Sequence, residues 1–361
     1  MKVVYYVSDV RWGHAARTTL IVKELVRCGV KVIIKTRKPV NFLKTELKEE
    51  LKKGAVAVIP KEDSGEPGWP PVYPFRKEEL IELVKGWLKG WKDNVETEEE
   101  FIRQSGASLV ISDVSPVALE AAHRAKIPAV AVSNFNWWDE YMYVLEDEEL
   151  LRPLKEAYLK ADWVFLLPLE SENSAFRLKE RVELVARPHN PDNVRKIRRE
   201  LIRRYRPEMI AALTTGGFYL PDKEEITMAV KEASRKARIL WVVQPTFKPP
   251  EDILYHIPEP HLFRDTLASC DFIVAKFGYS TASEALVSRI PMVLLYRSQI
   301  LEDSLASEEL VMAGCAIRFP LGEEFSIPLE NLWSISFAGL SKRMQNTGSE
   351  RIVNRLLERF L

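Results

Sequence analysis

The sequence predicts an α/β protein with two Rossmann-like domains that face each other across a cleft. Short runs rich in β-branched residues alternate with amphipathic segments, a pattern typical of parallel sheets covered by helices. The alternation restarts after a basic, proline-containing segment at residues 187–207. The chain of 361 residues is also long enough for two domains of ~150–200 residues each.

The predicted elements follow one another in the same order in each half. An apolar run at 1–7 leads into an amphipathic helix from about Ala15 to Cys28, with Gly29 as its stop. The strand-like runs that follow are VKVIIK, AVAVI, LVIS and PAVAVS, and those of the second half are MIAALT, ILWVV, FIVAK and PMVLLY. We therefore expect an N-terminal domain over 1–187, a linker over 188–207, a second domain over 208–345, and a C-terminal helix over 346–361 that could pack against either half.

Charge and cysteine content narrow the class of protein. Lys plus Arg and Asp plus Glu both total 52, so no global field favours nucleic acid or an anionic membrane. The charged fraction of 29%, mostly Lys, Arg and Glu, indicates a heat-adapted, hyperthermophilic source. Three widely spaced cysteines without CxxC argue against disulfides or zinc and for a reducing compartment.

No signal-peptide pattern and no long apolar run are present in this sequence, so we expect a soluble, cytoplasmic protein. The basic run RPHNPDNVRKIRRELIRRYR, residues 187–206, is typical of a solvated helix. We leave open whether this run contacts a phosphorylated or lipid-linked acceptor.

Ligands of open α/β sheets bind beyond the carboxyl ends of the strands, and two turns of the N-terminal half stand out there. In SDVRWGHAARTTL, residues 8–20, Gly13 permits close backbone approach, and the positive end of the following helix favours a neutral His14 that can accept a proton. Asp113, just after LVIS, could reach a histidine in the cleft. The alternatives are a plain loop histidine and a turn or N-cap aspartate.

Two turns of the C-terminal half indicate anion binding. Gly216 and Gly217 in LTTGGFY leave N–H groups free for an anion, although a plain tight turn fits equally, and neither a Walker loop nor GxGxxG is present. In CDFIVAKFGYSTASEALVSRIPMVLL, residues 270–295, hydroxyl side chains gather at a helix start and Glu284 follows one turn later. Backbone amides and hydroxyls suit a diphosphate, and a carboxylate suits the ribose, so this segment predicts a nucleotide site.

These residues resemble glycosyltransferases of the GT-B class, which have two Rossmann-like domains. The stretch LFRDTLASCDFIVAKFGYSTASEALVSRIPMVLL, with EDSLASEELVMAGCA, resembles their donor-binding region, as found in bacterial N-acetylglucosaminyltransferases of peptidoglycan synthesis and plant small-molecule glucosyltransferases. WGHAAR and LVISDVSPVALEAAHRAKIPAVAVSNFNWWDEY are similar to uncharacterised glycosyltransferase-like proteins and to the N-terminal region of plant L-arabinokinases.

The resemblance implies a role for each matching residue. His14 corresponds to the base that activates the acceptor, and Asp113 to the aspartate that orients it. Glu284 corresponds to the ribose ligand, and Phe263 offers its backbone to the base of the nucleotide. The remaining donor-binding residues are Gly278, Tyr279, Ser280 and Thr281 with Gly216 and Gly217 at the diphosphate, Glu302 and Asp303 at the sugar, and Lys276 at the donor site in general; Trp12, Arg17 and Asn134 fall on the acceptor side.

The chain departs from the family pattern at two places. The first turn is usually richer in glycine, whereas here Asp9, Val10, Arg11 and Trp12 occupy it, so Trp12 could narrow the acceptor pocket or the site could be closed. The plant family's sugar-specifying signature is incomplete, which leaves the donor sugar open.

Together these features predict a glycosyltransferase that moves a sugar from a nucleotide-sugar donor to a hydroxyl acceptor with inversion. The donor is a co-substrate, expected to be UDP-linked, and no other cofactor is expected. The absence of a DxD motif predicts a reaction without a metal. A nucleotide-sugar hydrolase or epimerase, and a non-catalytic nucleotide-binding protein, are the alternatives. The acceptor and the oligomeric state are not predicted.

Overall fold

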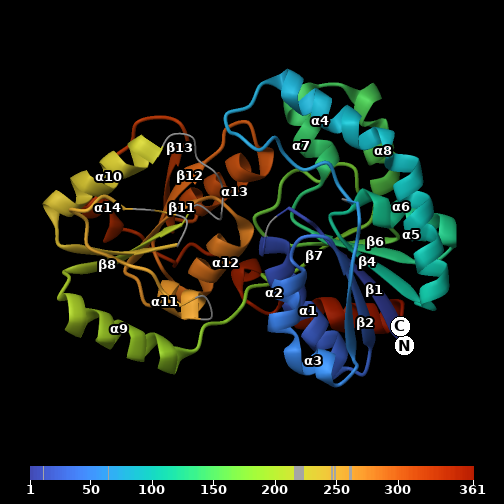
Figure 1. Cartoon of the computed structure of the whole chain (residues 1–361), viewed down its shortest axis with the longest axis horizontal. Coiled ribbons are helices and arrows are strands. Elements are labelled where there is room, and N and C mark those ends of the chain that lie inside the picture. The colour runs from blue at the N-terminus through green and yellow to red at the C-terminus, as the bar shows by residue number, and fades with distance from the viewer. Residues whose placement is uncertain (11, 64, 215–222, 245–246, 248, 260–261) are drawn as a thin grey trace.

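The computed structural model describes residues 1–10, 12–63, 65–214, 223–244, 247, 249–259 and 262–361. In this part of the chain two parallel sheets lie side by side, each flanked by helices (Figure 1). Their strand orders are β3-β2-β1-β4-β5-β6-β7 and β10-β9-β8-β11-β12-β13. The predicted α/β class with two parallel sheets is therefore confirmed.

The first sheet is most apolar at its centre, where helices cover it. Every residue of β4 and β5 is buried, as expected for parallel strands with both faces covered. The strands are β1 (Lys2–Val7), β2 (Lys31–Thr36), β3 (Val56–Pro60), β4 (Leu109–Asp113), β5 (Ala129–Ser133), β6 (Trp163–Leu166) and β7 (Lys179–Arg181). The helices are α1 (Trp12–Arg27), α2 (Val40–Glu46), α3 (Lys48–Lys52), α4 (Lys77–Lys89), α5 (Trp91–Ser105), α6 (Pro116–Ala125), α7 (Trp137–Leu145) and α8 (Glu148–Tyr158).

The second sheet repeats the pattern after α9 (Pro191–Tyr205), a largely exposed helix formed by the basic run. Its strands are β8 (Met209–Thr214), β9 (Ile239–Val243), β10 (Tyr255–His256), β11 (Phe272–Lys276), β12 (Met292–Tyr296) and β13 (Ala316–Pro320). The helices are α10 (Lys223–Lys236), α11 (Phe263–Leu267), α12 (Tyr279–Ser288), α13 (Leu301–Met312), α14 (Leu329–Leu332) and the 3-10 turn η2 (Lys342–Met344).

The last helix, α15 (Gly348–Arg359), returns to the first sheet and packs against α1. Its buried side chains Ile352, Val353 and Leu356 belong to the same apolar cluster as Ile21 and Leu25 of α1. We call the first sheet with its helices and α15 the first lobe, and the second sheet with its helices the second lobe.

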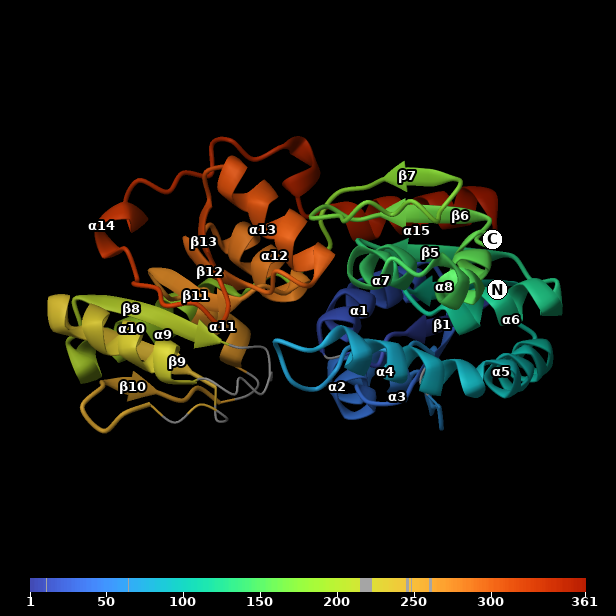
Figure 2. The same ribbon diagram turned by 90° about the horizontal axis from the view of Figure 1, so that it is seen from above.

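The two lobes meet through helices that follow the carboxyl ends of their strands. Figure 2 shows α12 and α13 of the second lobe directed toward α1 and α7 of the first, and both helix pairs, α1 with α12 and α7 with α13, are in contact. Hydrogen bonds between Tyr73 and Ser298 and between Phe75 and Gln299 join the lobes at one side. No helix among the described residues has the length and apolar character that a membrane crossing requires.

Candidate active site

A histidine and an aspartate from the first lobe meet at the lobe interface. Asp113 ends β4 beside Val7, the last residue of β1, and is fully buried. Its Oδ1 atom lies 2.7 Å from Nδ1 of His14 in the first turn of α1. The structure thus brings together two residues that lie 99 positions apart, the two that the sequence predicted as a catalytic pair.

Two contacts at Nδ1 of His14 bear on its tautomer. The Arg17 nitrogen 2.9 Å from Nδ1 can only donate and opposes a proton there. The Asp113 carboxylate oxygen can only accept, and its contact is the shorter one at 2.7 Å, so we assign the proton of a neutral imidazole to Nδ1. The lone pair is then on Nε2, for which the structure gives no hydrogen-bond partner within the described ranges. Such a ring can accept a proton from an acceptor hydroxyl. Directly after Asp113, Val114 has φ = +71°, a strained conformation for a β-branched residue of the kind that gathers at functional sites.

Arg17, one turn further along α1, pairs with the same carboxylate. Its Nε lies 2.8 Å from Asp113 Oδ2, and one terminal nitrogen lies 2.5 Å from Asp113 Oδ1. Burial by itself would raise the pKa of Asp113, but Arg17 and then His14 outweigh it and hold that pKa below its usual value. The sequence placed Arg17 on the acceptor side. It did not predict the contact with Asp113, for which the i, i+3 spacing from His14, putting both on one helix face, was the available signal.

Asn134 connects this cluster to the second lobe. Its side-chain oxygen accepts a hydrogen bond from Arg17, and its amide nitrogen donates to Glu302 of α13 at 2.7 Å. The backbone N–H of Glu302 in turn donates to Glu140 of α7 at 2.9 Å. A residue predicted on the acceptor side and a residue predicted at the donor sugar are therefore in direct contact across the interface.

Glu140 is a buried carboxyl group at this interface that the sequence analysis did not single out. It is 1% exposed, and its Oε2 atom has no hydrogen-bond partner within the described part of the chain. Burial, together with the nearby Glu302 and Asp303, raises the pKa of Glu140 well above its usual value. In the sequence it lies in the segment NFNWWDEY, half of which is aromatic, and a carboxyl group beside these aromatic residues was the available signal.

The substitution Glu140→Gln is expected to stabilise the fold at neutral pH by about 1–3 kcal/mol, the usual cost of an unpaired buried polar atom. The neutral amide would remove a negative charge that Glu302 and Asp303 disfavour. Because the folded state raises the pKa of Glu140, the natural side chain favours folding fully below about pH 4.3 and loses that contribution as the pH rises. The advantage of the variant should therefore vanish in acid and grow toward neutral pH.

Urea unfolding between pH 4 and pH 8 measures this difference. The exposed Glu308 of α13 offers a matched control, and Glu308→Gln should change the unfolding free energy little at any pH. A Glu140→Gln chain that is less stable than the natural one at neutral pH contradicts the prediction.

The start of α12 forms the face of the second lobe nearest to His14. Ser280 Oγ donates a hydrogen bond to the Gly13 carbonyl at 2.9 Å, and Thr281 beside it is partly exposed. Gly278 caps the helix, and a Cβ atom built on it would meet nothing within 4 Å. The first backbone N–H groups of the helix can therefore meet an anion. Tyr279 is buried, burial raises its pKa to about 12, and its hydroxyl accepts from the Val185 N–H.

Glu284, the predicted ribose ligand, is paired with Arg187. The Arg187 Nε lies 2.8 Å from the Glu284 carboxylate, and another nitrogen of the same guanidinium lies 3.5 Å from Glu46 of α2. Burial raises the pKa of Glu284, and Arg187 opposes this rise. The carboxylate lies at the lobe interface as predicted, in contact with a cation that the sequence analysis did not single out.

The remaining predicted residues are distributed around this interface. Asp303 is fully buried and paired with Arg297 at 2.7 Å; burial would raise its pKa, but Arg297 and Lys276 hold it below its usual value. Phe263 begins α11 and is partly buried. Trp12 is 53% exposed at the start of α1, and its ring centroid lies 5.9 Å from that of Phe42. Arg11, Gly216 and Gly217 lie outside the described residues.

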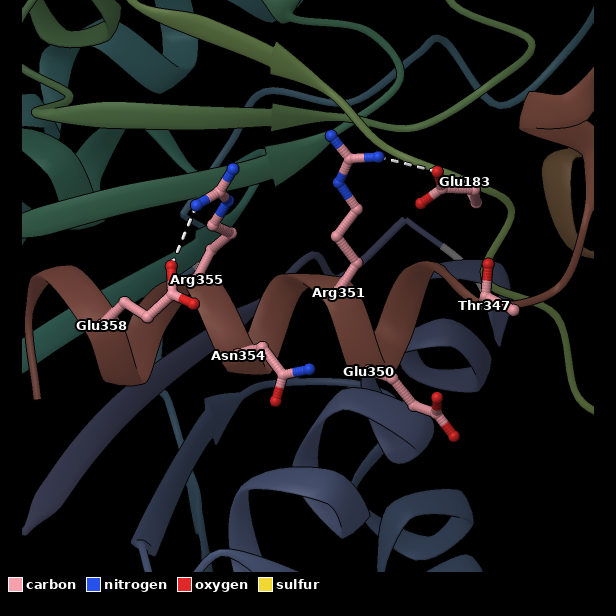
Figure 3. A pocket seen from close by; sticks show the side chains of 7 residues that line it. All are labelled: Glu183, Thr347, Glu350, Arg351, Asn354, Arg355 and Glu358. Carbon is pink, nitrogen blue, oxygen red and sulfur yellow. Dashed lines mark hydrogen bonds and ion pairs between the residues drawn. The ribbon is translucent and has the colours of Figure 1, made fainter.

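Two other features of the described residues are separate from the site around His14. Among the described residues, no three His, Cys, Asp or Glu side chains are arranged to hold a metal ion. A hollow of about 410 Å³ on the outer face of α15 (Figure 3) is lined by Glu183, Thr347, Glu350, Arg351, Asn354, Arg355 and Glu358. Its charged side chains largely pair with one another, as Arg351 does with Glu183, and none of them belongs to the predicted site.

Comparison with known proteins fits this geometry. No family model matches the chain. An L-arabinokinase from Arabidopsis thaliana is 26% identical over 328 residues, which cover 87% of this chain and 30% of that protein. Among solved structures, the glycotransferase of kitacinnamycin superimposes with a TM-score of 0.63 at 15% identity, covering 100% of this chain and 99% of the other. The chain has the GT-B fold.

A second GT-B structure, Arabidopsis thaliana UGT89C1 complexed with UDP, superimposes with a TM-score of 0.64 at 13% identity, covering 100% of this chain and 95% of the other. The fold and the similarity to L-arabinokinase confirm the resemblance stated from the sequence. The chain spans 30% of the length of that L-arabinokinase, so the likeness concerns one part of a longer protein.

Proposed function

We propose that the chain transfers a sugar from a nucleotide-sugar donor to a hydroxyl acceptor, with inversion at the anomeric carbon and without a metal ion. The observation that carries this proposal is the meeting of the His14–Asp113 pair with the start of α12, where Ser280 contacts Gly13 at 2.9 Å. A base and a diphosphate cradle are thus adjacent across the lobe interface. The GT-B fold supports the same reaction class.

In the proposed reaction His14 acts as the general base. Its Nε2 takes the proton of the acceptor hydroxyl while the acceptor oxygen attacks the anomeric carbon. The bond from that carbon to the diphosphate breaks, and its electron pair leaves with the diphosphate. Asp113 holds the Nδ1 proton and so keeps the ring oriented. A single in-line displacement of this kind inverts the configuration of the sugar.

The second lobe would bind the donor. Backbone N–H groups at the start of α12, with the Ser280 and Thr281 hydroxyls, would stabilise the charge that develops on the leaving diphosphate. Glu284 would bind the ribose in place of its contact with Arg187. Glu302, held by Asn134 and adjacent to Asp303, would meet the donor sugar. UGT89C1 has been solved with UDP and with UDP-L-rhamnose, which supports UDP as the nucleotide.

A thermal-shift screen of nucleoside diphosphates and their sugars tests the donor half of the proposal. UDP and one or more UDP-sugars are expected to raise the melting temperature with concentration, and Glu284→Ala should weaken this response, whereas Glu308→Ala on the exposed face of α13 should not. No response to any nucleoside diphosphate contradicts the proposal. Rapid release of UDP without an acceptor would instead favour a hydrolase.

A further inference from the structure

Arg17 engages both oxygens of the carboxylate that the proposed mechanism places behind His14. Its Nε and one terminal nitrogen lie 2.8 and 2.5 Å from the two oxygens of Asp113, a bidentate arrangement. Its other terminal nitrogen donates to Asn134, and the ring of Tyr279 lies 5.0 Å from the guanidinium carbon. Arg17 is 2% exposed, so solvent does not screen this ion pair. The proposed reaction steps do not use Arg17.

The position of Arg17 changes the charge balance around His14. While the imidazole is neutral, Asp113 and Arg17 cancel each other. Once His14 takes a proton, the three side chains carry a net positive charge. Because Nδ1 of His14 lies 2.7 Å from the carboxylate and 2.9 Å from an Arg17 nitrogen, attraction and repulsion of the new charge are of similar size.

Among the described residues, no carboxylate besides Asp113 forms a hydrogen bond or ion pair with His14 or Arg17. Tyr5 of β1 and Tyr279 of α12 face the ion pair, and burial raises the pKa of both hydroxyls, so both are neutral. Phe135 places an apolar ring 5.8 Å from the imidazole. The nearest further carboxylate along this hydrogen-bond chain, Glu302, lies on the far side of the Asn134 amide. The cluster of His14, Asp113 and Arg17 therefore holds one carboxylate, and Arg17 already engages both of its oxygens.

We infer that Arg17 is a specificity-determining residue, which withholds the charge of Asp113 from His14 and so restricts the reaction to acceptors with an acidic hydroxyl. This inference rests on the proposed function. In the step concerned, the acceptor O–H bond breaks, its proton moves to His14 Nε2, and its oxygen bonds to the anomeric carbon as the diphosphate leaves. An acidic hydroxyl gives up its proton to a weaker base, so it reacts where a less acidic hydroxyl does not.

Nitrogen-15 NMR of the histidine-labelled chain tests the charge effect without any substrate. The sequence contains five histidines, and His14 is assigned by the signal lost in His14→Gln. The ratio of imidazolium to imidazole at His14 is measured at pH 6 in the natural chain and in two variants. Arg17→Gln should raise the His14 ratio about tenfold or more, and Arg17→Lys, which keeps the charge, should not.

An unchanged ratio in Arg17→Gln overturns the inference. Should that variant fail to fold, the natural chain still decides, because equal rates with acidic and non-acidic acceptors overturn the inference equally. A merely structural role of Arg17 would lower stability in both variants and leave the ratio unchanged.

The dependence of the transfer rate on the acidity of the acceptor provides the second test. With the donor found by thermal shift, initial rates are measured for 4-nitrophenol, phenol and cyclohexanol. The natural chain should show a steep fall in rate with falling acidity, and Arg17→Gln a shallower one. Equal rates across the series overturn the inference while supporting a transferase. Transfer to none of many acceptors contradicts the proposed function instead, and the NMR ratio then decides the role of Arg17.

Discussion

Replacement of His14 by glutamine is expected to slow sugar transfer by about 10²–10⁴-fold, the usual contribution of a positioned general base, with nucleotide affinity nearly unchanged. Glutamine keeps a polar side chain in the first turn of α1 but cannot accept the proton. Nucleotide binding should persist because the proposed diphosphate and ribose contacts belong to α12 in the second lobe.

Steady-state rates of nucleotide release and thermal shifts with UDP measure the two halves of this prediction. His123→Gln on the exposed side of α6 is the matched control and should leave both unchanged. Unaltered turnover in His14→Gln would rule out the base, whereas loss of both turnover and UDP binding would indicate that the substitution disturbs the interface as a whole.

Removal of the Asp113 carboxylate is expected to cost about 3–5 kcal/mol of folding free energy, the range for a buried ion pair that loses one partner. In Asp113→Ala the guanidinium of Arg17, itself 2% exposed, would stay buried opposite a neutral site. Chemical denaturation measures the loss. The exposed pair of Glu232 and Lys236 on α10 offers a contrast, since Glu232→Ala should cost less than about 1 kcal/mol.

A double variant separates the ion pair from general damage to the core. Asp113→Leu with Arg17→Met removes both charges, so most of the lost stability should return. A double variant as unstable as Asp113→Ala alone would show that packing, and not the unpaired guanidinium, causes the loss.

The stability supplied by Asp113 also has a pH dependence of known sign. Its pKa in the folded state is lowered, so the contribution is present above about pH 4 and is lost as the pH falls through the lowered pKa. The difference between the natural chain and Asp113→Ala should therefore narrow in acid.

Much of the architecture can be predicted from the sequence because it depends on local patterns. Alternating apolar runs and amphipathic helices specify parallel βαβ units, and the functional turns of such sheets lie at the carboxyl ends of the strands. That rule points to His14 after β1, Asp113 at the end of β4 and Ser280 after β11, without knowledge of any contact between them.

The tertiary structure alone decides how these side chains are paired. Asp113 contacts both His14 and Arg17, Asn134 contacts Glu302 at a separation of 168 residues, and Glu284 contacts Arg187. Periodicity describes the faces of one helix or strand, and it carries no information on which buried charges meet across two sheets. Those pairings determine whether a carboxylate is free for a substrate. The sequence thus indicated which residue types lie at the ends of the strands, while the fold set their charges and their partners.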